Sequence, residues 1–226
     1  MWWTRTLRRN LLAFAGISGR GGLRLLDAGC GAGGLLAALG REFPGAQIAG
    51  IDRDFLAASL ARECGAAPVA QAEIERLPFR DGSFDAVFSA DVLCHRGVDQ
   101  DRALAEIRRC LKPGGRAVLN LPAYQWLYSA HDRAVDNARR YRIGEVRLLL
   151  RQAGFAKVRA TYWNTLLFPL MVTRRKLCRG TRSEVALLPA PAEFLLGAAA
   201  SLESRAVSWG LRLPFGGSIV AAGLRP

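Results

Sequence analysis

Short apolar runs alternate with amphipathic segments along most of the chain. A short apolar run between turn signals is typical of a buried strand, whereas apolar residues three and four positions apart indicate a helix. Ala103, Leu104 and Ile107, for example, repeat at helical spacing. Strands are expected at 25–28, 47–51, 68–70, 86–89, 116–121, 157–163 and 218–224, and helices at 35–39, 55–64, 101–111 and 143–153. This order predicts a doubly wound α/β domain on a mostly parallel sheet.

Two segments lie outside this alternation. Residues 1–12 are basic and amphipathic, which predicts a helical cap within residues 1–19. Residues 165–217 separate the last two strands and are predicted to form an α-helical insertion, with one helix at 192–211 whose apolar side is Leu195, Ala199, Leu202, Ala206 and Trp209. The whole chain, 1–226, is interpreted as a single domain.

The insertion also contains an apolar run at 166–172, which is followed by a basic cluster of Arg174, Arg175, Lys176, Arg179 and Arg182. An apolar patch beside basic residues suits contact with an acidic membrane surface. The alternative is that the run packs under the insertion and the basic side chains are solvated. The insertion is therefore a lid, a dimer surface or a membrane-touching flap.

The strongest chemical signal is the glycine-rich turn after the first strand. It reads Asp27-x-Gly29-x-Gly31-x-Gly33, and such glycines let a ligand approach the backbone. An acid before the first glycine suits a cationic amino-acid group better than a pyrophosphate. Asp52 ends the next apolar run, where a ribose-binding carboxylate is expected. A ligand with an amino-acid end and a ribose end is S-adenosylmethionine; the alternative is a glycine cluster without a ligand.

Three further segments complete a resemblance to class I S-adenosylmethionine-dependent methyltransferases. They are Glu73–Phe79, Asp81–Ser89 and Leu111–Gly115, and they follow the glycine-rich turn at the spacing of that family. The resemblance covers residues 20–164 and the last strand. It implies a seven-stranded sheet whose last strand is reversed, and S-adenosylmethionine as the cofactor. The cofactor-binding residues that it implies are Trp3, Asp27, Gly29, Gly31, Asp52, Arg53, Glu73, Ile74, Ser89 and Ala90.

A second group of residues is predicted to face the methyl acceptor. His131 and Asp132 follow the fifth strand, and a histidine–carboxylate pair near arginines and a tyrosine can accept a proton and hold an anion. The predicted catalytic residues are therefore His131, Asp132 and Tyr141, with His95, Tyr124, Arg139 and Arg140 as substrate-binding residues. The alternative is structural: His131 caps a helix and the arginines pair with Asp132 or Asp136. No metal site is predicted.

The net charge and the cysteine content predict the kind of binding partner and the cellular compartment of the protein. Lys and Arg number 32 against 19 Asp and Glu, a formal charge of +13. This charge indicates an anionic partner, either nucleic acid or an acidic membrane, or reflects arginine-favouring codons. The five cysteines include no C-x-x-C pair, which argues against a zinc site or a disulfide framework. With no signal-peptide pattern and no membrane-spanning apolar run, the protein is expected in the cytoplasm, either free or peripheral at the inner face of the membrane.

These features predict methyl transfer to oxygen or carbon of a small or lipid-like acceptor, and the resemblance implies an acceptor of the quinone, polyketide or envelope-lipid kind. Nucleic-acid methylation is the alternative. It is disfavoured because residues 89–92 read Ser-Ala-Asp-Val where amino-methyltransferases of nucleic acids have an (Asp/Asn)-Pro-Pro-(Tyr/Phe) tetrad. A third possibility is a cofactor-binding protein without transferase activity.

Overall fold

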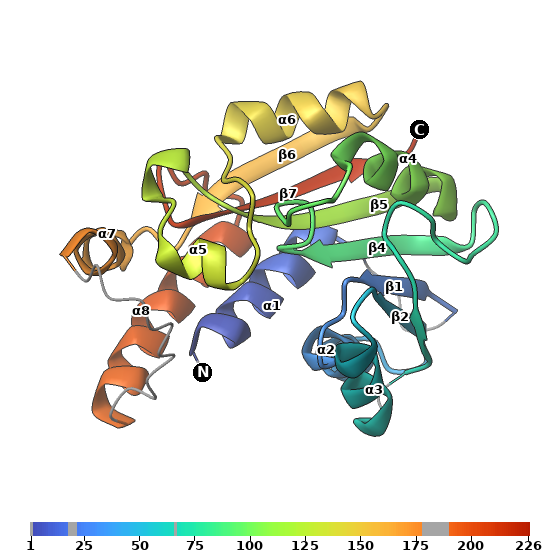
Figure 1. Cartoon of the computed structure of the whole chain (residues 1–226), viewed down its shortest axis with the longest axis horizontal. Helices are drawn as coiled ribbons and strands as arrows, with labels where there is room; N and C mark the ends of the chain where they lie inside the picture. The colour runs from blue at the N-terminus through green and yellow to red at the C-terminus, as the bar shows by residue number, and fades with distance from the viewer. Residues whose placement is uncertain (1, 18–21, 66, 178–189) are drawn as a thin grey trace.

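A computed structural model describes residues 2–17, 22–65, 67–177 and 190–226 (Figure 1). The predicted mixed sheet is confirmed: its seven strands lie in the order β3-β2-β1-β4-β5-β7-β6. All neighbours are parallel except β7, which pairs antiparallel with both β5 and β6. The strands are β1 (Arg24–Ala28), β2 (Gln47–Asp52), β3 (Val69–Gln71), β4 (Phe84–Ala90), β5 (Leu111–Pro122), β6 (Ala156–Trp163) and β7 (Ser218–Leu224).

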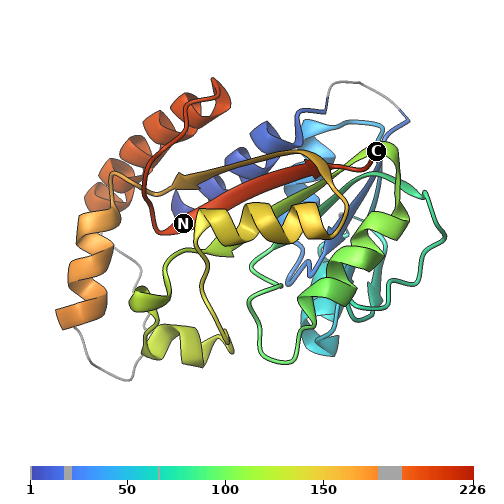
Figure 2. The same ribbon diagram turned by 90° about the horizontal axis from the view of Figure 1, so that it is seen from above.

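Helices cover both faces of the sheet (Figures 1 and 2). One face packs on α4 (Gln100–Cys110) and α6 (Ile143–Gln152), and the other packs on α1 (Trp2–Ala15) and α2 (Gly34–Glu42). The central strands β4 and β7 are almost fully buried because helices cover both faces of the sheet, which explains why their sequences are mostly apolar. A further helix, α3 (Phe55–Glu63), follows β2.

The insertion between β6 and β7 contains α7 (Phe168–Leu177) and α8 (Ala190–Ser208). Figure 2 shows α8 running beside the N-terminal helix α1, and Gly197 of α8 lies close to Trp2. α8 is shorter than the predicted 192–211 helix, because the chain turns at Gly210 with a φ of 89°. Trp209, which was predicted on the apolar side of this helix, therefore follows its end. Arg179 and Arg182 of the predicted basic cluster lie outside the described residues.

The carboxyl end of β5 leads into a segment that the apolar pattern did not predict. It contains a short 3-10 helix, η1 (Gln125–Leu127), and one helical turn, α5 (Ala130–Ala134). At its other end β5 starts at Leu111 instead of residue 116, because Leu111 already pairs with Phe84 of β4. The segment after β5 lies beside the ends of the strands that carry the predicted site.

Candidate active site

A cavity of about 470 Å³ lies at the carboxyl ends of β1, β2 and β4. Ligands of doubly wound proteins bind at this edge of the sheet. The cavity brings together most of the residues predicted to bind the cofactor and one predicted to bind substrate: Gly29, Gly31, Asp52, Arg53, Glu73, Ile74, Ala90 and His95. It is also lined by Asp91, Val135 and Asp136, which the sequence patterns did not single out.

The glycine-rich turn closes one side of this cavity. Gly29 adopts a φ of 90°, and a Cβ atom on it would lie 2.1 Å from the Val92 side chain. Its backbone N–H donates to the carbonyl of Ile51 over 2.8 Å, which ties the turn to β2. Only glycine satisfies both the backbone angle and the close approach at this position. The turn is therefore shaped for a ligand that lies against the backbone.

Asp27 is buried directly beneath the turn, with 1% of its surface exposed. Neither carboxylate oxygen has a hydrogen-bond partner among the described residues. Burial, and then the charge of Asp52, raise the pKa of Asp27 to about 7. A buried carboxylate without a partner is costly, so its presence here indicates a missing cationic ligand.

Arg8 of α1 reaches the same turn from the other side. A Cβ on Gly34, the first residue of α2, would lie 2.2 Å from an Nη atom of Arg8. Burial, and then Arg41, lower the pKa of Arg8, while the charge of Asp27 opposes the shift. A guanidinium close to a carboxylate without a hydrogen-bond partner can bind a zwitterion, because the first pairs with a carboxylate and the second with an ammonium group. The amino-acid end of S-adenosylmethionine is such a zwitterion. The sequence patterns indicated a basic cap but not this contact.

Asp52 is positioned by the backbone of the turns around it. Its oxygens accept from the N–H groups of Gly31 over 2.8 Å and Asp54 over 3.0 Å. Arg53 lies at the same rim and pairs with Asp136 over 3.3 Å. Because a carboxylate offers about four acceptor positions, Asp52 can still accept from ribose hydroxyls. The residues present thus fit the predicted cofactor at both of its ends.

Asp91 follows the last residue of β4 and adopts a φ of 58°. Its Oδ1 accepts from the amide nitrogen of Asn120 over 2.9 Å, and the amide oxygen of Asn120 accepts from the indole nitrogen of Trp163 over 2.8 Å. An indole N–H only donates, so Trp163 fixes which way the Asn120 amide faces. Among the described residues no hydrogen bond to Oδ2 of Asp91 is found. Asp91 is thus an oriented carboxylate with one oxygen available in the cavity.

Trp3 and Ser89, two further predicted cofactor residues, lie outside the cavity lining. Trp3 is half-buried and packs on Trp163, with ring centroids 5.8 Å apart. Ser89 is buried in β4, where its hydroxyl has no hydrogen-bond partner in the described structure. Through Trp163, the N-terminal helix touches the same side chain that orients Asn120.

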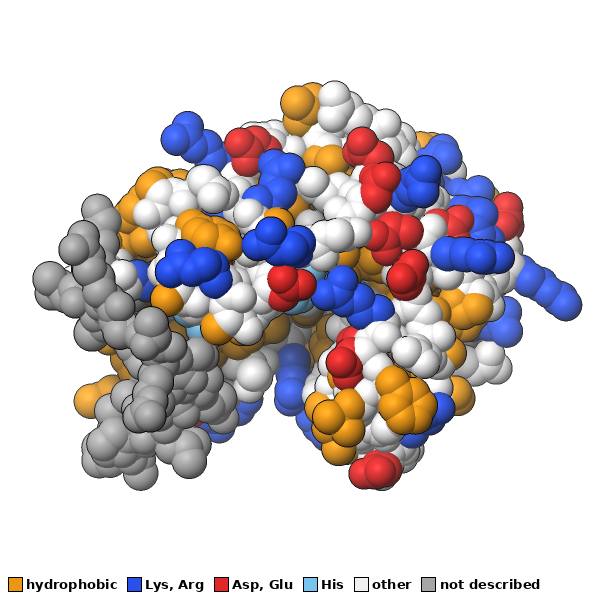
Figure 3. Space-filling view, viewed as in Figure 1, with side chains coloured by type: hydrophobic (Ala, Val, Ile, Leu, Met, Phe, Trp, Pro, Cys, Tyr) orange, Lys and Arg blue, Asp and Glu red, His pale blue; other side chains and the backbone are white. Residues whose placement is uncertain are grey.

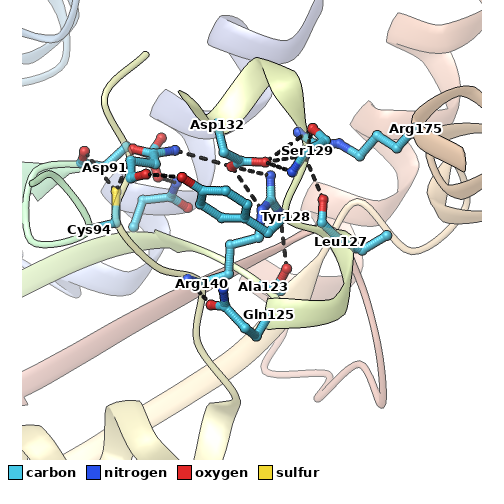
Figure 4. A network of polar contacts seen from close by, with 12 residues as sticks. Asp91, Cys94, Ala123, Gln125, Leu127, Tyr128, Ser129, Asp132, Arg140 and Arg175 are labelled. Carbon is cyan, nitrogen blue, oxygen red and sulfur yellow. Dashed lines mark hydrogen bonds and ion pairs between the residues drawn. The ribbon is translucent and has the colours of Figure 1, made fainter. Parts of the chain in front are cut away.

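The segment after β5 is held by a buried network centred on Asp132 (Figure 4). Asp132 is fully buried and pairs with Arg140 over 2.8 Å and with Arg175 of α7 over 2.7 Å. Its oxygens also accept from the backbone N–H of Ser129 and from the side chain of Asn137. Burial alone would raise the pKa of Asp132, but the bonds and charges of the two arginines outweigh it and lower the pKa to about 2.

The structure places three of the predicted site residues in or next to this network and outside the cavity lining. Asp132 is enclosed by the two arginines, which gives it a structural role in this segment. Arg140 is buried, and its guanidinium donates hydrogen bonds to Asp132 and to the carbonyl of Ala123. It is therefore not available to substrate. Tyr141 is also buried, and its hydroxyl donates to the carbonyl of Leu93 over 2.8 Å. Arg175 of the basic cluster belongs to this network and not to a solvated or membrane-facing surface.

The remaining predicted residues fall in different places. His95 lines the cavity and is half-buried. His131 is exposed on α5 and is not among the residues that line the cavity. Arg139 is exposed and lies over the ring of Tyr141 at 4.7 Å. Tyr124 stacks on Tyr162 at 5.1 Å, in an aromatic cluster that also contains Trp126, Phe168 and Phe215.

Replacing Asp132 by Ala is expected to lower the free energy of unfolding by about 3–5 kcal/mol, because two guanidinium groups lose their buried partner. The carboxyl pKa is lower in the fold than in the unfolded chain, so the stabilisation is present above about pH 4. It is lost as the pH falls toward 2. Urea unfolding of both proteins across this range measures the effect.

Asp136→Asn in the same segment is the matched control, because asparagine removes the charge and tolerates the φ of 56° at this position. Asp136 pairs with Arg53 and Arg96 while half of its side chain is exposed. Its loss is expected to cost less than about 1 kcal/mol. Equal effects of the two substitutions would contradict the assignment of Asp132 as the buried anchor.

Comparisons with known proteins agree with this geometry. Residues 26–119 match the family model of a methyltransferase domain. A ubiquinone/menaquinone biosynthesis C-methyltransferase, UbiE, of Desulfotalea psychrophila is 39% identical over 115 residues, which are 49% of this chain and 45% of that protein. Cycloartenol-C-24-methyltransferase 1 of Oryza sativa is 30% identical over 117 residues, which are 49% of this chain and 32% of that protein. The chain thus matches less than half the length of these two curated relatives.

Among solved structures, phosphoethanolamine N-methyltransferase 2 of Haemonchus contortus, in complex with S-adenosyl-L-methionine, superposes with a TM-score of 0.67. It is 20% identical and the match covers 99% of this chain and 53% of that one, so this likeness shows the fold. The family model covers the glycine-rich turn, β2 and β4, which are the elements that build the cavity. Residues 26–119 are thus similar to a methyltransferase domain, and the fold of the chain is that of the phosphoethanolamine N-methyltransferase.

Proposed function

We propose that the protein transfers a methyl group from S-adenosylmethionine to a small-molecule acceptor with an apolar part. The observation that carries this proposal is the glycine-rich turn, which lines the cavity together with Asp52 and has the buried Asp27 and Arg8 of α1 close to it. Asp27 would hold the ammonium group of the cofactor, Arg8 its carboxylate and Asp52 its ribose hydroxyls. Glu73 and Ile74, which line the same cavity, would hold the adenine. When bound, the cofactor supplies a methyl group on a sulfonium cation.

Asp91 is the side chain best placed to accept the proton of the acceptor. It lies at the end of β4 in the cavity, and Asn120 holds one of its oxygens. Burial raises the pKa of Asp91 to about 7, while the hydrogen bond from Asn120 and the charge of Arg140 oppose the shift. A base with this pKa is matched to work near neutral pH. His131 is the second candidate for this role.

The aromatic cluster supports an acceptor with an apolar part. Tyr124, Tyr162 and Phe168 meet at the carboxyl ends of β5 and β6, and the cofactor cavity lies at the carboxyl ends of the neighbouring strands. By name, the relatives described above act in quinone and sterol synthesis. Figure 3 shows basic and acidic side chains intermixed on the face in view, an arrangement unlike a basic groove for nucleic acid. We therefore favour oxygen or carbon of a quinone- or lipid-like molecule as the methylated atom.

The test uses methyl-labelled S-adenosylmethionine, the purified protein and a cell extract that is separated into lipid, small-molecule, protein and nucleic-acid pools. Label is expected in the organic phase. Label in RNA would contradict the proposed small-molecule acceptor and would support the proposed methyltransferase activity. Cofactor binding without label in any pool would overturn the transferase activity itself.

We also propose that the protein works in the cytoplasm, at the inner face of a membrane. Among the described cysteines, Cys30, Cys94 and Cys110 are buried free thiols, which suit a reducing compartment. Phe194 and Leu202 of α8 and the nearby Trp209 expose 75%, 63% and 85% of their surfaces. Arg205 and Arg212 are exposed near them in the chain. In the part of the chain that the structure describes, no helix has the length and apolarity needed to cross a bilayer.

The double substitution Leu202→Ser and Trp209→Ser is expected to reduce sedimentation with anionic vesicles at low salt, because exposed apolar side chains enter the lipid interface. Leu148→Ser is the matched control, since Leu148 is an equally exposed leucine on α6. If the double variant and the control sediment alike, this surface does not contact the membrane.

A further inference from the structure

Three basic side chains surround a second cavity, of about 220 Å³, at the edge of the sheet opposite the cofactor cavity. Arg116 begins the part of β5 that pairs with β7, and Lys157 and Arg159 lie near the start of β6. Register places both arginines beside β7, with Arg116 opposite Leu224 and Arg159 opposite Ala222. The sheet thus brings Arg116 beside Lys157 and Arg159, which lie on a strand that follows much later in the sequence.

The two guanidinium groups are fixed at the end of α1. Arg116 donates to the carbonyl of Ala15 over 3.0 Å, and Arg159 donates to the carbonyl of Phe14 over 3.1 Å while lying over the Phe14 ring. Nitrogens of both guanidinium groups lie within 3.3 Å of the point where a Cβ would stand on Gly16. Each guanidinium has five N–H donors, so most of them remain available after these contacts.

Lys157 stands at an irregularity of β6. The pairing of β6 with β7 shifts between Ala156 and Arg159, and Lys157 adopts a φ of 46°. This left-handed conformation is uncommon for a residue other than glycine, asparagine or aspartate. Such bulges redirect side chains, and here Lys157 joins the lining of the cavity.

The charge of this cluster is not balanced in the described structure. No ion pair joins Arg116, Lys157 or Arg159 to a carboxylate within the described ranges. Burial and the charge of Arg116 lower the pKa of Arg159, which shows that the two guanidinium groups repel one another. The carbonyls at the end of α1 carry only a partial negative charge. An anion in the cavity would relieve this repulsion.

We propose that Arg116, Lys157 and Arg159 form a binding site for a phosphate group, separate from the methyl-transfer site. Arginine forks bind tetrahedral oxyanions through paired hydrogen bonds, and a lysine ammonium adds a point charge. The phosphate group can belong to a free phosphate compound or to a phospholipid headgroup. The site lies at the amino ends of β5 and β6, whereas the cofactor cavity lies at the carboxyl ends of the strands. It therefore takes no part in methyl transfer, and a phosphate compound bound there would either anchor the protein or regulate it.

Titration calorimetry with inorganic pyrophosphate, at constant ionic strength, tests the site directly. Wild-type protein is expected to bind, and Lys157→Gln to weaken binding about tenfold, the effect of losing one charge-assisted hydrogen bond. Arg159→Lys keeps the charge and loses the fork, so it is expected to weaken binding as well. Arg151→Gln, which removes an exposed charge from α6, is the matched control and should bind as wild type does.

Vesicles that contain a phosphomonoester lipid, compared with soluble pyrophosphate, identify the source of the phosphate. If vesicles and pyrophosphate compete for binding at the same residues, the natural ligand is a phospholipid headgroup. If the protein binds pyrophosphate but not the vesicles, the natural ligand is a free phosphate compound. Equal weakening of binding in Lys157→Gln and Arg151→Gln would overturn the proposal, because the binding would then follow net charge alone. Unchanged affinity of Lys157→Gln would overturn it as well. Absence of pyrophosphate binding by wild-type protein would overturn it too. Thermal unfolding of each variant verifies that the fold is retained.

Discussion

Replacing Asp27 by Asn is expected to weaken binding of S-adenosylmethionine about 100-fold or more. The variant keeps the shape of the side chain and loses its charge, and the loss of one partner from a buried charge pair costs about 2–5 kcal/mol. Calorimetry with S-adenosylmethionine measures the change. Asp101→Asn, in the first turn of α4, is the matched control and is expected to bind as wild type does. Unchanged affinity of Asp27→Asn would remove Asp27 from the site.

The same substitution is expected to stabilise the protein without ligand. The pKa of Asp27 is about 7 in the fold and about 4 in an unfolded chain, so the fold favours the protonated acid. Its contribution to stability is fully present below about pH 4 and is lost as the pH rises through 7. Above pH 7 the variant should be more stable than wild type by about 4 kcal/mol, an upper estimate from the shift in pKa.

Urea unfolding at pH 4 and pH 8 separates the two effects of this substitution. The stability difference should appear at pH 8 and nearly vanish at pH 4. A gain in stability together with a loss of affinity is the signature of a residue kept for binding. If Asp27→Asn is less stable at both pH values, then the carboxylate serves the fold and the cofactor assignment loses its main support.

The fold could be predicted from the sequence because its signals are local. Each apolar run of the sheet corresponds to a strand, and the glycine-rich turn needs only its own residues to specify a ligand-binding backbone. The position of Asp52 at the end of β2 follows from the strand itself. These features depend on sequence neighbours and on the rule that parallel strands end at one edge.

The roles of the polar residues after β5 could not be predicted in this way. His131 and Asp132 are adjacent in sequence, but Asp132 turns inward to meet Arg175, which is 43 positions away. Likewise, Asp91 acquires its orientation from Asn120 and Trp163 on two other strands. A polar pattern gives the chemistry of a side chain, whereas its partners depend on packing between distant segments. For the same reason, the basic cluster of the insertion could not be divided into buried and exposed arginines.

Replacing Asp91 by Asn is expected to lower the rate of methyl transfer about 100- to 1,000-fold, the range that loss of a general base produces. Cofactor affinity should stay within error, because the oxygen of the new amide can still accept from Asn120. Transfer by wild-type protein should rise with pH through about 7, as Asp91 becomes ionised, and this dependence should be absent from the variant. The rate is measured as label moved from S-adenosylmethionine into the acceptor pool.

His131→Ala is the comparison that decides between the two candidate bases. Because His131 is exposed and outside the cavity lining, its loss is expected to leave the rate and its pH dependence close to wild type. Asn120→Ala should lower the rate less than Asp91→Asn does, since the carboxylate remains and loses only its orientation. A large loss in His131→Ala with none in Asp91→Asn would transfer the role of base to His131. A loss of cofactor affinity in Asp91→Asn would instead make Asp91 a cofactor-binding residue, since proton transfer alone does not change the ground-state affinity for the methyl donor.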